Sequence, residues 1–166
     1  DTYESAKEAG KLIGATVGGG EFAAVPEIRQ IEVDGVKGKA KGLEIVDSWD
    51  VHINATVLEI KESVLKDALC ASDVKDSEDV EGYREITARN NIELTDYIDN
   101  ITWVGTLSGS DKPVIIQIFN ALDMAGLTLT TQDKNQSSVS MEYNGHYKQD
   151  DLDTPPFKIY YPKVDD

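Results

Sequence analysis

The chain has 166 residues, of which 31 are acidic and 16 are basic, so its formal net charge is -15 at pH 7. This charge argues against general binding to nucleic acids, because affinity for phosphates depends on Lys and Arg. A single cysteine, Cys70, excludes an internal disulfide, and one cysteine with two histidines is too few for a structural zinc site.

Alternation of apolar and polar residues is the main pattern in the sequence, and it predicts a mostly β fold. In the longest run, residues 45–57, Val51 belongs to an apolar face and His52 to a polar one, with Asp47 as the one interruption of the apolar face. We expect strands, in chain order, at residues 11–16, 28–33, 45–57, 84–94, 99–107, 114–118, 127–129 and 139–143.

One segment has helical spacing instead. Its apolar residues are Val64, Leu65, Ala68 and Leu69. Glu62 lies where a helix N-terminus favours negative charge. The pattern predicts one short helix over residues 61–71. The acidic run that follows it, residues 73–83, is expected to be a solvated loop.

Glycine, proline and asparagine clusters mark the turns. We expect turns at residues 18–20, 108–113, 123–126, 132–136 and 153–156. The sequence shows no internal repeat and no linker composition. Residues 1–166 are therefore expected to form a single domain.

The segment DGVKGKAKGL, residues 34–43, places three lysines on alternate positions among glycines. It lacks the upstream glycine of a phosphate-binding loop. In a protein this acidic, three lysines on a flexible loop could bind the negative surface of another copy; the alternative is that they only keep a hairpin loop soluble. The candidate residues of such a contact are Asp34, Gly35, Lys37, Gly38, Lys39, Lys41 and Gly42.

No pattern in the sequence indicates an enzyme. His52 and His146 could each serve a nucleophilic triad, but neither lies in a local signature such as a nucleophile elbow. The aspartates at 150, 151 and 153 lack the spacing of an EF-hand loop. The glycine cluster at 14–22 lacks the GxGxxG spacing of a dinucleotide site. We therefore predict no catalytic residue, no cofactor and no metal.

Long alternating strands leave unpaired backbone edges unless another segment covers them. Identical subunits can close such pairing into a ring. Membrane insertion is not expected, because no apolar run approaches the length of a membrane span. The sequence pattern thus favours self-association over chemistry.

Several stretches resemble the tail tube proteins of long-tailed bacteriophages and related prophages. EIRQIEVDGVKGKAKGLEIVDSWDVHINATVLEI, followed by the expected helix, is similar to the front half of that family. LTDYIDNITWVGTLSGSDKPVIIQIFNAL, GLTLTTQDKNQSSVSMEYNGHY and TPPFKIYYP resemble its later parts. The similarity covers nearly the whole chain in the same order and with similar spacing.

The resemblance implies an antiparallel β-sandwich or barrel-like subunit with one short flanking α-helix. Six copies would form a ring, and stacked rings would form the tube through which DNA is ejected. The loop at 34–43 would reach the neighbouring ring, and an acidic lumen would let DNA slide.

The partners implied are further copies of the chain, the tape measure protein and the initiator and terminator proteins of the tail. DNA would pass without specific binding, and no membrane or small-molecule substrate is implied. The protein would reside in the virion tail after assembly in the cytoplasm of an infected or lysogenic bacterium.

Three alternatives remain open. An inner tube of a contractile injection system or bacteriocin shares the architecture. A monomeric β-sandwich binding module, such as a carbohydrate-binding or adhesin domain, would expose aromatic residues, whereas Trp49 and Trp103 lie in strand patterns that predict burial. A hydrolase using His52 or His146 is the third alternative.

Overall fold

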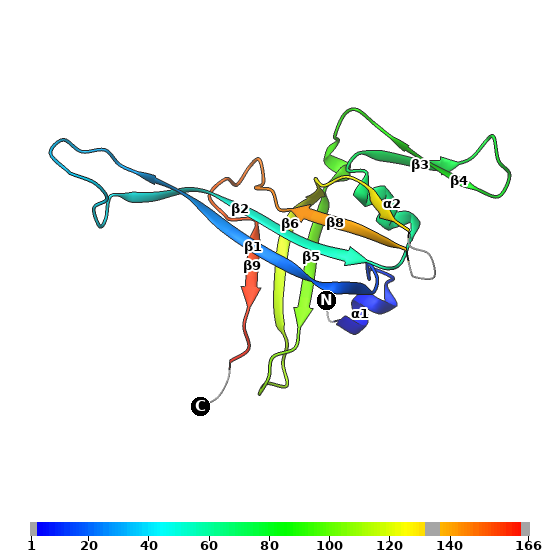
Figure 1. Cartoon of the computed structure of the whole chain (residues 1–166), viewed down its shortest axis with the longest axis horizontal. Coiled ribbons are helices and arrows are strands. Elements are labelled where there is room, and N and C mark those ends of the chain that lie inside the picture. Colours follow the sequence, from blue (N-terminus) through cyan, green and yellow to red (C-terminus); the bar gives the residue numbers. More distant parts are fainter. Residues whose placement is uncertain (1–2, 132–136, 164–166) are drawn as a thin grey trace.

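Antiparallel strands make up most of the computed structural model, which describes residues 3–131 and 137–163 (Figure 1). The elements are α1 (Tyr3–Glu8), β1 (Thr16–Gln30), β2 (Glu44–Val57), α2 (Glu62–Ala68), β3 (Ser72–Asp76), β4 (Arg84–Ala88), the 3-10 helix η1 (Leu94–Asp96), β5 (Ile98–Gly105), β6 (Val114–Asp123), β7 (Thr128–Thr130), β8 (Ser138–Asn144) and β9 (Phe157–Tyr160). The predicted mostly β, antiparallel fold class is confirmed.

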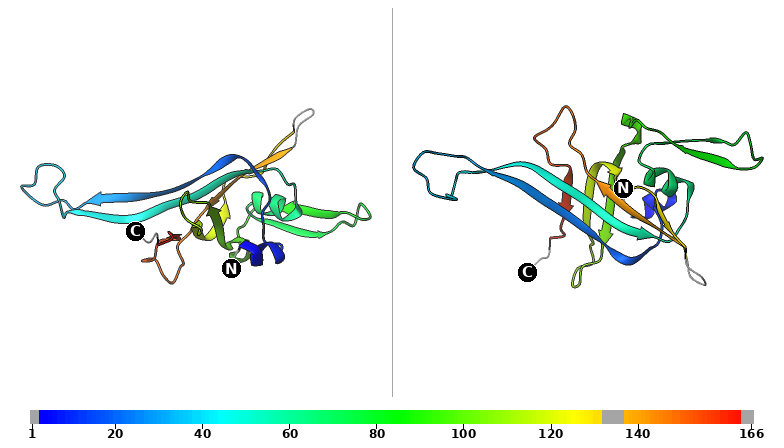
Figure 2. Two further views of the ribbon diagram at one scale, coloured as in Figure 1. Left: turned by 90° about the horizontal axis from the view of Figure 1, so that it is seen from below. Right: turned by 45° about the horizontal axis from the view of Figure 1, so that its top comes forward.

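Seven strands form one branched sheet that folds into two layers. β1, β2, β8 and β7 make the first layer, and β5, β6 and β9 make the second. β6 joins them, because its main part pairs with β5 and β9 while its last residues, Leu122 and Asp123, pair with β8. The strands of the two layers cross each other in Figure 1, and Figure 2 shows the second layer below the first.

The change of layer occurs at Asn120, whose backbone has a left-handed φ of 49°. Its side-chain amide donates to the carbonyl oxygen of His146 at 2.8 Å, and the N–H of His146 donates to the carbonyl oxygen of Phe119 at 3.1 Å. These bonds replace the regular ladder where it is interrupted. An asparagine is suited to this position because it tolerates the left-handed region better than most residues.

The core lies between the two layers and beneath α2. Its buried members are Val51, Ile53, Val57, Val64, Ala68, Ile118, Ala121, Val139, Met141 and Tyr143. Phe157 of β9 contacts the rings of Phe22 and Trp49, with centroid separations of 6.0 and 5.5 Å. The apolar face predicted for residues 45–57 therefore turns inward where the layers overlap, and its polar face turns outward.

β1 and β2 extend far beyond the layers as a two-stranded arm, whose tip loop, residues 31–43, lies at one end of the molecule (Figure 1). The strands pair from Thr16 with Val57 to Gln30 with Glu44. Asp47, the interruption in the apolar alternation, forms a two-bonded ion pair with Arg29 across the arm, with distances of 2.8 and 3.1 Å. The interruption thus lies where the arm has left the core.

The predicted boundaries at the start of the chain are wrong. Residues 11–15 are not a strand, and the segment at 18–20 is not a turn but lies inside β1. Gly18 and Gly19 have positive φ angles and form a bulge, seen as a register shift between Val17 and Gly20. Glycines allow either a turn or a bulge, and the sequence alone favoured the turn. The helix α1 was not predicted.

The acidic run predicted as a loop over 73–83 is also corrected, because its first part is strand. β3 and β4 form a separate two-stranded hairpin that projects at the end of the molecule opposite the arm tip (Figure 1). Val74 pairs with Ile86, and Lys75 lies 3.8 Å from Glu85. Cross-strand charge pairs and one apolar pair therefore support strands inside a charged run.

The strand predicted at 28–33 overlaps only the end of β1, which begins at Thr16 and ends at Gln30. The remaining boundaries differ by smaller amounts. α2 ends before the predicted residue 71, because Cys70 has a φ of 65° that a right-handed helix does not allow. The strand predicted at 84–94 ends at Ala88, and β9 was not predicted. The predicted turns at 108–113, 123–126 and 153–156 lie between strands, whereas the one at 132–136 falls outside the described residues.

Candidate assembly surfaces

The two histidines lie in separate surroundings. His52 lies on the outward face of β2, with its Nε2 3.9 Å from a carboxylate oxygen of Glu21. His146 has its Nδ1 3.0 Å from the carbonyl oxygen of Asn120, and its ring meets Tyr97 edge-on. Within residues 3–131 and 137–163, neither ring is hydrogen-bonded to a serine, threonine or cysteine. The geometry therefore provides no activated nucleophile next to a base.

The acidic residues do not converge into a metal site in the part of the chain that the structure describes. There, no group of three or more His, Cys, Asp and Glu side chains is placed to hold a metal ion. Asp151 instead accepts the backbone N–H of Thr154 at 3.2 Å, which closes a turn. None of the helices in these residues is long and apolar enough to cross a membrane.

The candidate loop residues lie together at the arm tip. Gly35, Gly38 and Gly42 have φ angles of 87°, 89° and 92°, which only glycine adopts without strain. The tip is a folded loop: Val36 donates to Val33, Leu43 donates to Ala40, and the Gln30 side chain donates to the carbonyl oxygen of Gly38 at 2.7 Å. The three glycines therefore form turns that present Lys37, Lys39 and Lys41 to solvent.

Exposed apolar side chains run along the arm behind these lysines. They are Val25, Ile28, Ile31, Val33, Val36, Ile45 and Val46. A register shift after Glu27 places Ile28 opposite Val46, on the face of the arm opposite to Val25, so exposed apolar residues lie on both faces. Contiguous exposed apolar residues on a projecting hairpin indicate a protein interface, because an isolated two-stranded hairpin is only marginally stable in water.

The outward face of the first layer has a different character. The register of β1, β2 and β8 places polar and acidic residues there: Glu21, Glu27, Ser48, Asp50, His52, Asn54, Thr56, Ser140, Glu142 and Asn144. Hydrogen bonds on this face join Ser48 to Glu27 at 2.9 Å and the Glu21 N–H to Asn54 at 3.0 Å. Ala23 and Val25 share this face, because they pair with His52 and Asp50. Arg29 is the one Lys or Arg in β1, β2 and β8, and it is paired with Asp47, so the face is mainly polar and acidic.

Both layers have strand edges that no described segment covers. β1 pairs only with β2, and β5 and β9 each pair only with β6. Their outer N–H and C=O groups are open to another chain. Pro26 lies within β1 without disrupting the ladder, as expected at an edge, where a proline removes no pairing to a neighbouring strand.

Trp103 is not buried as predicted. Its side chain is 49% exposed, and its ring lies over Gly105, where an added Cβ would be 1.9 Å from the ring. Together with Phe22, Ile53 and Ile116 it lines a hollow of about 440 Å³ at the open side of the two layers. Trp49 is partly buried against Phe157, in keeping with its strand pattern.

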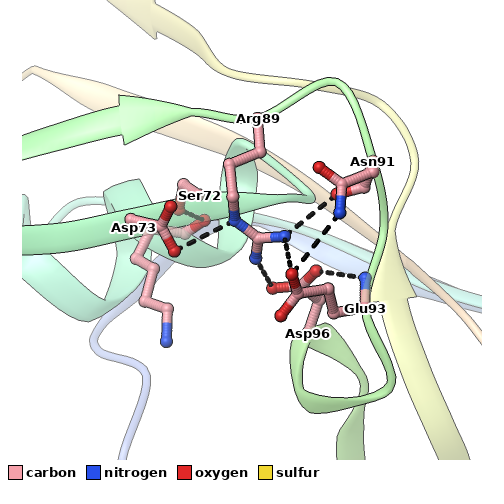
Figure 3. A network of polar contacts seen from close by, with 7 residues as sticks. Ser72, Asp73, Arg89, Asn91, Glu93 and Asp96 are labelled. Carbon is pink, nitrogen blue, oxygen red and sulfur yellow. Dashed lines mark hydrogen bonds and ion pairs between the residues drawn. The ribbon is translucent and has the colours of Figure 1, made fainter.

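Arg89 ties the root of the β3–β4 hairpin to the rest of the molecule (Figure 3). Its guanidinium lies 2.6 Å from Asp96, 3.0 Å from Asp73 and 3.4 Å from Glu93. It also donates to the carbonyl oxygen of Asn91 at 3.0 Å. The Nε–Asp73 contact is an ion pair without hydrogen-bond alignment. Nothing in the sequence pattern signalled this cluster.

Three ionisable groups lie near α2 and the end of β6, where Asp123 and Tyr143 are buried and Asp67 is partly buried. Asp123 is 1% exposed, and its carboxylate accepts the N–H groups of Ala125, Gly126 and Glu142. Burial raises the pKa of Asp123, and it raises the pKa of Asp67 to about 6. Burial also raises the pKa of Tyr143, whose hydroxyl has no hydrogen-bond partner among the described residues. Because burial disfavours the charged forms of these groups, their protonation is linked to the stability of the fold.

A comparison of the chain with protein-family models, curated proteins and solved structures found no match.

Proposed function

We propose that the chain is a structural subunit of a bacteriophage tail tube, without catalytic activity, in which six copies close into a ring and rings stack into a hollow tube. The observation that carries the proposal is the outward face of the first layer. It is broad and mainly polar and acidic, and the one Lys or Arg in its strands β1, β2 and β8, Arg29, is paired with Asp47. Such a face suits the wall of a channel for DNA.

The physical reason lies in how proteins hold phosphates. Each Lys or Arg that reaches a phosphate releases counterions and adds affinity, so cations in a bore would retain the passing DNA. Glu21, Glu27, Asp50 and Glu142 repel the phosphates instead. The serine, threonine and asparagine side chains between them are short and hydrated. A wall of this kind repels DNA without obstructing it.

The open edges supply a way to close the ring. β1 borders the acidic face and has no partner on its outer side among the described residues. Main-chain pairing between this edge and a neighbouring copy would continue the acidic face from one subunit to the next. The arm, which leaves the layers altogether, would link one ring to another. Tape measure, initiator and terminator proteins complete the proposed set of partners, and the virion tail is the proposed location.

Negative-stain microscopy of the concentrated protein tests the proposal. We expect rings, or filaments of stacked rings, with six-fold end-on averages and a stain-filled bore. Solid filaments, or assemblies whose subunits present the acidic face outward, would contradict it. An inner tube of a contractile injection system would give the same images, and sheath genes beside the coding gene would distinguish the two.

One observation favours a second candidate, a monomeric carbohydrate-binding module. Exposed Trp103 beside an apolar hollow is an arrangement on which a sugar ring can stack. A glycan-binding screen of the parent and of Trp103→Ala tests it. Binding that the substitution abolishes would support the module, and binding to no glycan would remove it.

A further inference from the structure

We infer that the arm tip of one copy, residues 31–43, binds the acidic turn of the β3–β4 hairpin of the next copy, residues 76–83, in a head-to-tail contact. This inference names the surface that receives the arm and rests on the proposed stacking of copies.

The two surfaces lie at opposite ends of the molecule. The arm tip is at one end of the long axis and the acidic turn is at the other, in both Figure 1 and Figure 2. One copy therefore cannot make the contact with itself. The contact joins two different patches, so it is heterologous and can be repeated from copy to copy without limit. That is the geometry that stacking needs.

The charges of the two surfaces are complementary. The acidic turn carries Asp76, Glu78, Asp79 and Glu81 and no Lys or Arg. Asp76 is 96% exposed and reaches only Arg84, at 3.7 Å, while no described residue forms an ion pair with the other three. The three lysines of the arm tip likewise have no ion-pair partner among the described residues. Both sets of charges are thus available to another chain.

Apolar side chains accompany the charges on both surfaces. Tyr83 is 68% exposed and Val80 lies beside it in the turn. The arm tip offers Ile31, Val33 and Val36, all exposed. Burying these residues against one another would add a favourable apolar contribution to the ionic contact. An aromatic residue at the centre of a charged rim is typical of protein interfaces.

Both surfaces are already ordered, which lowers the entropy lost on association. The acidic turn is closed by the Ser77 N–H donating to the Tyr83 carbonyl at 2.8 Å and by the Val80 N–H donating to the Ser77 hydroxyl at 3.2 Å. Arg89 fixes the hairpin root through Asp73 and Asp96, as Figure 3 shows. The arm tip has its own turns and the bond from Gln30 to Gly38.

Reciprocal charge reversal tests the contact. One variant carries Lys37→Glu, Lys39→Glu and Lys41→Glu, and the other carries Glu78→Lys, Asp79→Lys and Glu81→Lys. Self-association of the full chain is measured by sedimentation velocity at about 50 mM and at about 300 mM salt, since ionic contacts are screened at the higher concentration. Circular dichroism shows whether each variant keeps its fold, as expected for exposed loop positions.

Each variant alone should associate about tenfold more weakly than the parent at low salt, because it presents two surfaces of the same sign. An equimolar mixture of the two variants should recover association, since each then meets an opposite surface on the other. The matched control for the arm variant is Lys7→Glu with Lys112→Glu and Lys148→Glu, which lowers the net charge as much as the arm variant does but leaves both surfaces intact. It should associate like the parent.

The outcomes separate this contact from the proposed function. Three results would overturn the contact. They are a parent protein that stays monomeric at low salt, a hairpin variant that associates as strongly as the parent, and a mixture of the two variants that does not recover association. Hollow tubes that grow normally from the hairpin variant would leave the tail tube proposal standing and remove only this contact. Head-to-tail chains of subunits without a bore would support this contact and contradict the tail tube proposal.

Discussion

At the scale of single residues, the carboxyl group of Asp67 links the fold to pH. Partial burial of this residue in the last turn of α2 raises its pKa to about 6, against an ordinary value of 3.8. The folded chain therefore holds this proton more tightly than the unfolded chain does. Between about pH 4 and pH 6 the unfolded state loses the proton first, so this group lowers the free energy of unfolding as the pH rises through that window.

Replacing Asp67 with Asn should remove this decrease in the free energy of unfolding with rising pH. An amide cannot ionise, so the variant should gain about 1–2 kcal/mol of stability over the parent above pH 6, after discounting the shift for partial solvent exposure. Urea unfolding from pH 3.5 to pH 7.5 measures it. The two chains should differ least at pH 3.5, where the carboxyl group is protonated in both states. A difference that does not change with pH would contradict the assignment.

The composition showed which metal-ligating residue types are rare in the chain, but it did not predict which ionisable side chains lie close together in the fold. One cysteine and two histidines were enough to argue against a zinc site, and the alternation around His52 correctly placed it on a polar face. The cluster of Asp67, Asp123 and Tyr143 was not predictable. Its members come from α2, β6 and β8, and only the fold brings them together.

At the scale of elements, Arg89 should decide whether the β3–β4 hairpin is rigid. Arg89→Ala would leave Asp96, which is 5% exposed, without its cation. Breaking a buried ion pair in this way typically costs about 3–5 kcal/mol. We expect a loss near the lower end, because the other carboxylates are exposed, together with faster hydrogen exchange of the β3 and β4 amides.

Arg84→Ala is the matched control. Arg84 also ties the hairpin to α2, through Glu62 at 2.7 Å, but both side chains are about half exposed. An exposed pair of this kind is worth about 0–1 kcal/mol. Equal losses from the two substitutions, in urea unfolding or in hydrogen exchange, would show that burial does not distinguish them and that Arg89 is not the anchor.

Helices and strands were predictable where the alternation of apolar and polar residues was long and regular. The predictions were wrong where one residue pattern fits two different local structures. β2 was predicted because its alternation runs across the core. The glycines at 18–20 favoured a turn but form a bulge, and the charges at 73–76 favoured a loop but pair across strands. β9 is short and its pattern covers only a few residues, so its pairing with β6 carries the assignment instead.

At the scale of the whole molecule, the sequence predicted a lysine-bearing loop but not that it stands at the opposite end from the acidic turn. Loop composition reveals charge, whereas the separation of the two surfaces follows from the lengths of β1 and β2 and from the branch at β6. The acidic face could not be predicted from the sequence for a related reason. Its residues come from three strands, and only the register brings their side chains to one surface.

That face permits a test of the proposed bore. Asp50→Lys with Glu142→Lys places two cations on neighbouring strands of the outward face while leaving the buried side untouched, so tubes should still form. Each lysine that reaches a phosphate should contribute about 0.9 to the slope of log affinity against log salt. Short linear DNA should therefore cosediment with tubes of this variant at low salt and be released at high salt, whereas parent tubes should not retain it.

Closed circular DNA is the decisive control, because it cannot thread into a bore. If the face lines the lumen, the variant tubes should retain the linear duplex and leave the circular duplex in solution. Equal retention of both forms would place the face on the outside of the tube. Retention of linear DNA by the parent would show that the carboxylates of Glu21, Glu27, Asp50 and Glu142 do not repel DNA as argued, since a wall that already binds phosphates cannot let them slide.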